Sequence, residues 1–446
     1  MRNICHRLRR KYLLIFLYLI VLYCIKEFIF TFAFNPITRW FPNESKSETV
    51  LQSTRPHIPQ RNATRRELIL LQMIFRHGHR APFNLYPNDN HPESFWKEGL
   101  GMLTQLGRLQ HYAMGDYLLK RYKSFITTNP KEVEVLNADS DRCQFGAFAF
   151  IAGLYAPAEE YRFTDEIRWQ PVISRHYVDK RNRYVLSRRK CPVASDDEHE
   201  MKMSREADDI REKYMPLYNF WSEHSGRNIK DWTRAADLAK TLACERDYNL
   251  TMPEWALRYW SELQRQAGLS YYWNFRTKLI HRYRIGPLLK YMLKNMEDKI
   301  RGYTPEKRVY VYSTHGSHLA CLLMALRQYN MKAPPHASTI VLELWKENES
   351  DYFVRWLYFN SSNPERQIHP PFVLRIGGCS GPFCPLTQFK YFIRDLLPDD
   401  WRKECNDFSM KKRFPHPVYI PSSSSNGKDL STVIIILILI FIYVLQ

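Results

Sequence analysis

The stretch at residues 72–82, "QMIFRHGHRAP", places two arginines, two histidines, a glycine and a proline directly after an apolar run. That run, Leu68–Phe75 ("LILLQMIF"), has the length of a β-strand and predicts a strand covered on both faces. In open α/β sheets, ligands bind beyond the carboxyl ends of the strands. We therefore expect residues 76–82 to form a ligand-binding turn.

Two later stretches follow the same plan. Residues 309–320, "VYVYSTHGSHLA", predict a strand that ends at His315 and a helix that begins near Ser317. Residues 132–142, "EVEVLNADSDR", alternate like a strand, pass through polar turn residues, and predict a helix from Arg142. We expect His315 and Arg142 to lie beside the 76–82 turn.

The wider pattern predicts an α/β protein that carries a helical insertion. Strands and helices alternate at both ends of the chain; one expected helix lies within 103–125, with Leu106, Leu109, Ala113 and Tyr117 at helical spacing. Residues from about 200 to 300 are helical in pattern. The predicted parts are an α/β catalytic domain split into 67–160 and 301–413, with a helical insertion at 161–300.

Both ends of the chain predict entry into the secretory pathway. Residues 1–34 combine a basic head with a short apolar run, as in a signal peptide or a signal anchor. A polar stalk follows at 35–66. Residues 414–446 read as a second stalk and an apolar tail, which is either a lipid-anchor (GPI) signal or a short membrane span. We expect the protein to be located at the extracellular face of a membrane or in the lysosomal lumen.

Composition supports an extracytoplasmic glycoprotein. The net charge of +19 favours anionic partners, and the absence of zinc-finger spacing or an arginine-rich arm disfavours nucleic acid. Five Asn-x-Ser/Thr sequences predict glycosylation, at Asn43, Asn62, Asn249, Asn348 and Asn360.

The 76–82 turn has the residues of a phosphate site. Arg76 and Arg80 flank His77, and guanidinium groups bind phosphate oxygens in pairs without losing their charge. A histidine nitrogen can attack phosphorus and form a covalent intermediate. Gly78 would let the backbone approach the ligand closely, and Arg142 would add a third positive charge. The alternative is a structural histidine whose neighbouring arginines pair with carboxylates.

The pattern Arg-His-Gly-x-Arg-x-Pro arises by chance in a chain of this length on the order of once in ten thousand. Further segments, "ADSDR", "RKCP", "NLTMPEWA", "YVYSTH" and "CSGPFCPL", follow in order. Over residues 66–413 the chain resembles the histidine acid phosphatases of the prostatic and lysosomal type. The resemblance implies a phosphoglycerate-mutase-like, doubly wound sheet domain with a smaller, mostly helical inserted domain. It also implies hydrolysis of phosphate monoesters through a phosphohistidine, without metal or cofactor. By this resemblance His77 is the nucleophile, and the phosphoryl group is held by His315, Arg76, Arg80 and Arg142.

One position departs from the family. An acidic proton donor normally follows the second histidine, but Gly316 stands there. Loss of a positioned acid costs roughly two to four orders of magnitude in rate, so we expect weakened activity. His318 and His79 are candidates for a substitute donor, although the spacing places neither at the site, and the alternative for His318 is an ordinary residue in the first turn of a helix. Two alternatives remain: a pseudophosphatase that acts as a phosphate-binding or interaction protein, and an inositol-phosphate phosphatase. The oligomeric state is open, and a homodimer is one option.

The cysteines also follow the family in part. The resemblance implies that Cys191 pairs with Cys405, and that Cys379 pairs with Cys384. Cys244 occupies a family disulfide position whose partner position holds Thr339. Cys244 is then free, or it pairs with Cys143 or Cys321.

Overall fold

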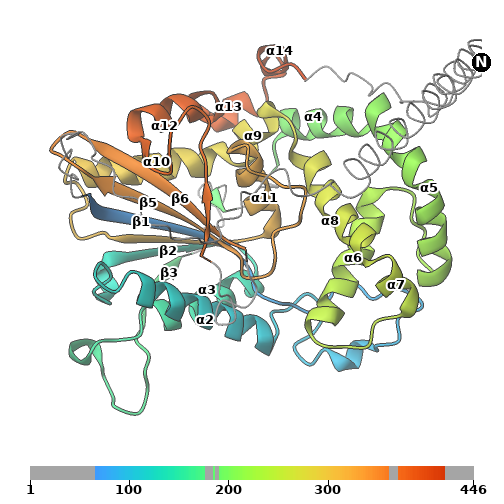
Figure 1. Ribbon diagram of the computed structural model, residues 1–446, viewed down its shortest axis with the longest axis horizontal. Coiled ribbons are helices and arrows are strands. Elements are labelled where there is room, and N and C mark those ends of the chain that lie inside the picture. The colour runs from blue at the N-terminus through green and yellow to red at the C-terminus, as the bar shows by residue number, and fades with distance from the viewer. Residues whose placement is uncertain (1–65, 176–183, 186–189, 361–369, 417–446) are drawn as a thin grey trace, which may run out of the picture. The chain divides into compact units, whose positions relative to one another are not determined.

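The computed structural model describes residues 66–175, 184, 185, 190–360 and 370–416. Its centre is one mixed sheet with the strand order β3-β2-β4-β1-β5-β6-β7, in which β8 also pairs with β6 (Figure 1). The strands are β1 (Glu67–Arg76), β2 (Val133–Asn137), β3 (Ser174–Arg175), β4 (Val309–Thr314), β5 (Thr339–Lys346), β6 (Tyr352–Phe359), β7 (Phe372–Leu374) and β8 (Cys384–Pro385). The α/β class is as expected.

The pairing of β1 brings four chain segments together at one end of the strands. β1 runs parallel to β4, with Arg76 opposite Thr314, and β4 runs parallel to β2. β5 runs antiparallel to β1, with Thr339 opposite Phe75. The carboxyl ends of β1, β2 and β4 therefore meet the loop that enters β5.

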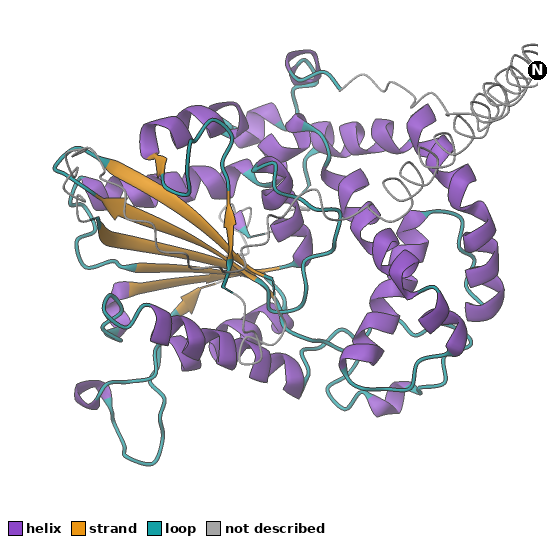
Figure 2. Ribbon diagram, in the orientation of Figure 1, coloured by secondary structure: helices purple, strands orange, loops and turns teal. Residues whose placement is uncertain are grey.

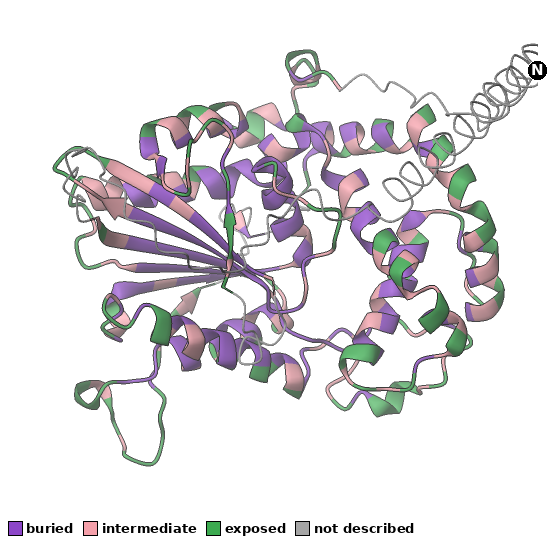
Figure 3. Ribbon diagram, in the orientation of Figure 1, coloured by how far each residue is buried: buried purple, intermediate pink, exposed green. Residues whose placement is uncertain are grey.

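Helices cover both faces of this sheet (Figures 1 and 2). Leu71, Met73 and Phe75 of β1 pack on the side of α2 and α3, whereas Leu70 and Ile74 pack on the opposite side. Burial on both faces explains the nearly unbroken apolar run, and each such side chain stabilises the fold by about 1.5–3 kcal/mol. Figure 3 shows the buried strands at the centre. The helices on the two faces are α2 (Gln105–Arg121) and α3 (Asp141–Leu154), and α9 (Lys278–Arg284), α10 (Gly286–Ile300), α11 (Gly316–Ala325) and α12 (Leu386–Ile393).

A helical part lies beside the sheet (Figure 1). It has its own apolar core, which includes Trp221, Leu238, Leu242 and Leu263. Within the predicted insertion 161–300, however, α9 and α10 pack on the sheet; the domain boundaries stay a prediction. The helical part comprises α4 (Pro192–Lys202), α5 (Arg205–Ser225), α6 (Trp232–Asp247), α7 (Glu254–Arg258) and α8 (Trp260–Phe275). The remaining short helices are η2 (Glu93–Phe95), η3 (Pro130–Glu132), η4 (Glu159–Tyr161), η7 (Arg394–Leu396), α13 (Trp401–Glu404) and α14 (Met410–Arg413).

Helix α2 forms where the sequence predicts it, but of the four residues at helical spacing only Ala113 is buried. Leu109 is 57% exposed, and His111 is buried instead. The reason is the close approach of α3: a Cβ at Gly115 would lie 2.1 Å from the carbonyl oxygen of Phe150. Helices this close select small residues at the contact, which a search for large apolar residues at helical spacing overlooks.

The structure contains disulfides between Cys191 and Cys405 and between Cys379 and Cys384. Among the described residues, Cys143, Cys244 and Cys321 are buried free thiols, so Cys244 pairs with neither of the others. Asn249 and Asn348 are exposed and Asn360 is partly buried, so glycosylation at these sites stays a prediction.

The predicted signal or anchor at 1–34 lies outside the described residues, as do almost all of the 35–66 stalk, most of 414–446, and both Asn43 and Asn62. In the part of the chain that the structure describes, none of the helices is both long enough and apolar enough to cross a bilayer.

Candidate active site

His77 lies one residue beyond β1, where its backbone N–H donates to the carbonyl of Thr314 at 2.9 Å. Its Nδ1 is 3.0 Å from the carbonyl oxygen of Gly78. Because a carbonyl only accepts hydrogen bonds, Nδ1 carries the proton and Nε2 keeps a free lone pair. Burial, together with nearby Arg76 and His315, holds the pKa of His77 well below its ordinary value. The ring therefore stays neutral, as a nucleophile requires.

His315 faces His77 from the end of β4, with ring centroids 5.6 Å apart. Its Nδ1 lies 3.4 Å from Nη2 of Arg142. A guanidinium only donates, so Nδ1 accepts and Nε2 carries the proton. Burial and Arg142 lower the pKa of His315 to about 3. A neutral His315 can thus donate a hydrogen bond to a phosphoryl oxygen.

Three arginines surround this pair without carboxylate partners. Arg76 donates to the carbonyl of Pro334 at 2.5 Å, and Arg80 donates to the carbonyl of Ala81 at 2.7 Å. Among the described residues, no acidic group forms an ion pair with Arg76, Arg80 or Arg142. Arg80 is only 3% exposed. Three guanidinium groups without an ion-paired carboxylate leave an excess of positive charge, which an anion would balance; this favours the phosphate site over the carboxylate-paired alternative.

Phe83 is a contact that sequence reasoning missed. The guanidinium carbon of Arg80 lies 3.8 Å from the centre of its ring, and that of Arg142 lies 5.0 Å away. Phe83 is 49% exposed and lines a cavity of about 460 Å³ together with Arg80. One ring thus orients two cations that come from separate elements. Its place in the sequence, three residues after Arg80, gives no sign of the contact with Arg142.

Gly78 packs against the start of α2. A Cβ at this position would lie 2.3 Å from the carbonyl oxygen of Gly107. The absence of a side chain at Gly78 therefore lets the first turn of α2 approach the turn closely. This close packing fixes the turn that carries His77 and Arg80.

The position of the missing acid lies next to Arg76. A Cβ at Gly316 would be 3.0 Å from Cδ of Arg76 and 3.0 Å from the hydroxyl of Tyr271. A side chain here would reach the arginine cluster, and glycine supplies no proton.

The two substitute donors suggested by the sequence have other environments. Both ring nitrogens of His79 are occupied, by the hydroxyl of Thr104 at 2.7 Å and by the carbonyl of Cys244 at 2.8 Å. Burial lowers the pKa of His79 to about 4. His318 is fully buried, and burial lowers its pKa to about 3. Neither ring lines the cavities beside Arg76 and Arg80.

A cavity of about 240 Å³ opens beside Arg76, and sequence reasoning missed three groups that line it: Asp247, Tyr271 and His336. They come from α6, α8 and the loop before β5, which are distant in the sequence. No local pattern in the sequence brings these three residues together.

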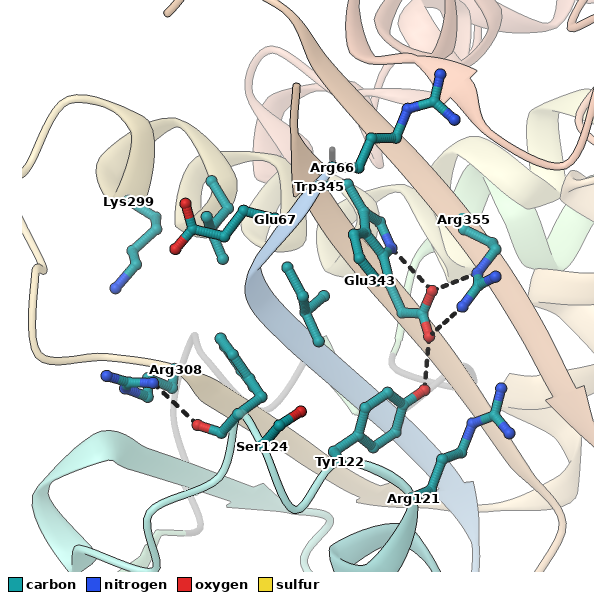
Figure 4. A pocket seen from close by; sticks show the side chains of 13 residues that line it. Arg66, Glu67, Arg121, Tyr122, Ser124, Lys299, Arg308, Glu343, Trp345 and Arg355 are labelled. Atoms are coloured by element: carbon teal, nitrogen blue, oxygen red, sulfur yellow. Dashed lines mark hydrogen bonds and ion pairs between the residues drawn. The ribbon is translucent and has the colours of Figure 1, made fainter. Parts of the chain in front are cut away.

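A larger cavity, of about 920 Å³, lies at the opposite end of β1 (Figure 4). It is rich in arginine, but its charges are partly balanced within the protein. Arg355 bonds Glu343, which also accepts from the hydroxyl of Tyr122 at 2.7 Å, and Arg66 pairs with Glu347. Its distance along β1 from His77 separates it from the phosphate site.

The chain is similar in sequence to known proteins. The family profile described as histidine phosphatase superfamily (branch 2) matches residues 67–359. The chain is 32% identical over 358 residues to human prostatic acid phosphatase, covering 77% of this chain and 89% of that protein. It is 31% identical over 357 residues to Xenopus laevis lysosomal acid phosphatase, covering 78% and 81%.

Solved structures share the fold. A Hafnia alvei phytase in complex with myo-inositol hexakis sulphate aligns with a TM-score of 0.58 and 16% identity, covering 76% of this chain and 98% of that one. A Citrobacter braakii phytase aligns with a TM-score of 0.58 and 16% identity, covering 76% and 99%.

Proposed function

Because this chain belongs to branch 2 of the histidine phosphatase superfamily and is a phosphatase of phosphate monoesters, we propose that it works through a covalent phosphohistidine on His77. The observation that carries the proposal is a neutral His77, with Nε2 free, among three arginines that lack carboxylate partners. A phosphate monoester would bring the negative charge that balances these arginines.

The first step forms a bond between Nε2 of His77 and phosphorus, and breaks the bond from phosphorus to the ester oxygen. Arg76, Arg80 and Arg142, with the Nε2–H of His315, would hold the phosphoryl oxygens and stabilise the charge that develops there. In the second step a water oxygen attacks phosphorus, and the electron pair of the P–N bond returns to His77. The Nδ1–H···O=C bond to Gly78 keeps the tautomer throughout.

The ester oxygen must gain a proton as it leaves, and Gly316 has none to give. We therefore expect weaker turnover than in a phosphatase with a carboxylic acid at this position, by roughly 10²- to 10⁴-fold for poor leaving groups. Aryl esters need less protonation of the leaving oxygen, because the aromatic ring spreads the negative charge of the departing phenolate. If turnover is lost for every ester while phosphate still binds, the chain is a pseudophosphatase.

The experiment is an assay of the purified protein on p-nitrophenyl phosphate at acid pH, beside His77→Ala. His199→Ala serves as the matched control, because His199 is an exposed histidine on α4. We expect the control to retain turnover and His77→Ala to lose it. Equal rates for His77→Ala and the parent protein would remove His77 from the mechanism.

A second candidate is a phosphatase of inositol phosphates. The observation in its favour is that Lys240 and Arg246 line the cavity beside Arg76, where they could bind further phosphate groups of one substrate. The measurement is the ratio of kcat/KM for inositol hexakisphosphate to that for p-nitrophenyl phosphate. If this candidate is correct, Lys240→Ala lowers the ratio several-fold. An unchanged ratio would favour simple monoesters.

A further inference from the structure

The loop that enters β5 is tied to the catalytic turn on both sides of His336. The side chain of Arg76 donates to the carbonyl of Pro334 at 2.5 Å, and the N–H of Ala337 donates to the carbonyl of His77 at 3.2 Å. Ala337 has a φ of 57°, in the left-handed region that residues other than glycine seldom adopt. Backbone of this kind is concentrated at functional sites. The loop thus fixes His336 relative to the nucleophile.

The His336 ring lies beside that of His77, with centroids 6.0 Å apart. The residue is 4% exposed. Its Nδ1 is 3.2 Å from a carboxylate oxygen of Asp247, whereas its Nε2 has no hydrogen-bond partner among the described residues. Nδ1 therefore donates to the carboxylate, and Nε2 is a buried nitrogen whose hydrogen-bonding capacity is unused.

His336 and Asp247 line the same cavity as Arg76 and Tyr271, the two residues that a side chain at Gly316 would touch. The cavity thus joins the position of the missing acid to a buried histidine supported by a carboxylate. We propose that His336, held by Asp247, gives the proton to the leaving oxygen in place of the acid that Gly316 lacks. This proposal rests on the proposed function. His336 would supply part of the proton donation that Gly316 cannot.

The proton balance closes over the two steps. As Nε2 of His77 bonds to phosphorus, the P–O electron pair moves to the ester oxygen, which takes the proton from Nε2 of the His336 imidazolium and departs as an alcohol. In the second step neutral His336 accepts a proton from the attacking water, the P–N bond breaks, and phosphate is released. His336 is then again an imidazolium, next to the Asp247 carboxylate.

The charge of His336 depends on what is bound. The charged and titratable groups around it are Asp247, Arg76, Arg80, His77, His79 and His111. Without substrate, burial and then Arg76 hold the pKa of His336 well below its ordinary value. A bound phosphate group offsets the positive charge of the arginines, while the carboxylate of Asp247 continues to favour the imidazolium. A bound phosphate ester thus removes the contribution of the arginines to the low pKa of His336, whereas the contribution of burial remains.

The test is leaving-group dependence in the full chain. His336→Asn keeps a donor toward Asp247 but has no transferable proton. We expect His336→Asn to slow the hydrolysis of glycerol phosphate by about 100-fold and that of p-nitrophenyl phosphate by less than about fivefold. Asp247→Asn, at a side chain that is 39% exposed, should act in the same sense with about a tenfold loss on the alkyl ester. Asp208→Asn, at an exposed carboxylate on α5 paired with Arg211, is the matched control and should change neither rate.

The two variants keep the proposal falsifiable even if one of them folds poorly. Unchanged rates, or equal losses on both esters, would overturn the assignment of His336 as donor. Failure of the proposed function looks different, because the parent protein would then turn over neither ester; that result would overturn both proposals together.

Discussion

At the scale of single residues, Phe83 shows how the phosphate site is oriented by a contact with no charge of its own. Its ring lies against the guanidinium groups of both Arg80 and Arg142. Cation–π contacts of this kind contribute about 0.5–2 kcal/mol. We predict that Phe83→Ala weakens competitive inhibition by inorganic phosphate roughly 3- to 10-fold, measured as the inhibition constant. Phe83→Tyr should keep the inhibition constant of the parent protein. Equally weakened inhibition in both variants would show that the ring matters only for packing.

Gly316 allows a direct test of the missing acid. We predict that Gly316→Asp accelerates hydrolysis of glycerol phosphate strongly and that of p-nitrophenyl phosphate only slightly, measured as the ratio of the two kcat/KM values. The new Cβ would crowd the hydroxyl of Tyr271 and Cδ of Arg76 at 3.0 Å. Adding Tyr271→Phe removes the hydroxyl and should enlarge the gain. Equal acceleration of both esters would instead indicate improved folding.

The sequence predicts those candidate site residues that belong to a short local motif. His77 and its flanking arginines share one strand end, and His315 and Arg142 follow two other strands. It does not predict His336 or Asp247, because their contact at 3.2 Å depends on the packing of α6 against the loop before β5. Pairs that meet only through tertiary packing leave no periodic signal in a single sequence.

At the scale of elements, strands form where the pattern of apolar residues predicts them, whereas closely packed helix faces are not predicted by that pattern. β1 and β4 form within one or two residues of the expected strands, since burial on both faces requires unbroken apolar runs. The contact of α2 with α3 is made by glycines and by His111, and the spacing of large apolar residues does not indicate it. Size and hydropathy do not identify such a face.

The two disulfides differ in what they join. Cys191 and Cys405 are 214 residues apart and tie the segment after α13 to the start of α4, whereas Cys379 and Cys384 are 5 residues apart. A cross-link over a longer loop restricts the unfolded chain more. We predict that Cys191→Ala/Cys405→Ala lowers the free energy of unfolding by about 2–5 kcal/mol, measured by urea denaturation. Cys379→Ala/Cys384→Ala is the short-loop comparison and should cost less; the reverse order would contradict this account.

At the scale of the whole molecule, buried histidines link stability to pH. Burial alone lowers the pKa of His111 from 6.5 to about 3. Between these values the unfolded chain binds a proton that the folded chain does not, so stability falls as pH falls, by about 1.4 kcal/mol per pH unit for each such group. We predict that His111→Leu reduces the slope of unfolding free energy against pH between 4 and 6 by about that amount. Exposed His199→Gln should keep the parent slope, and an unchanged slope in His111→Leu would contradict a neutral buried His111.

The central claim is that His77 carries the phosphoryl group, and trapping the intermediate tests it most directly. Phosphohistidine is stable in alkali and labile in acid, so a labelled phosphate ester should be mixed briefly with the protein and quenched at alkaline pH. We predict acid-labile label on the peptide that contains His77, and none in His77→Ala. Turnover of the ester without any label on His77, or label that persists in His77→Ala, would contradict the account.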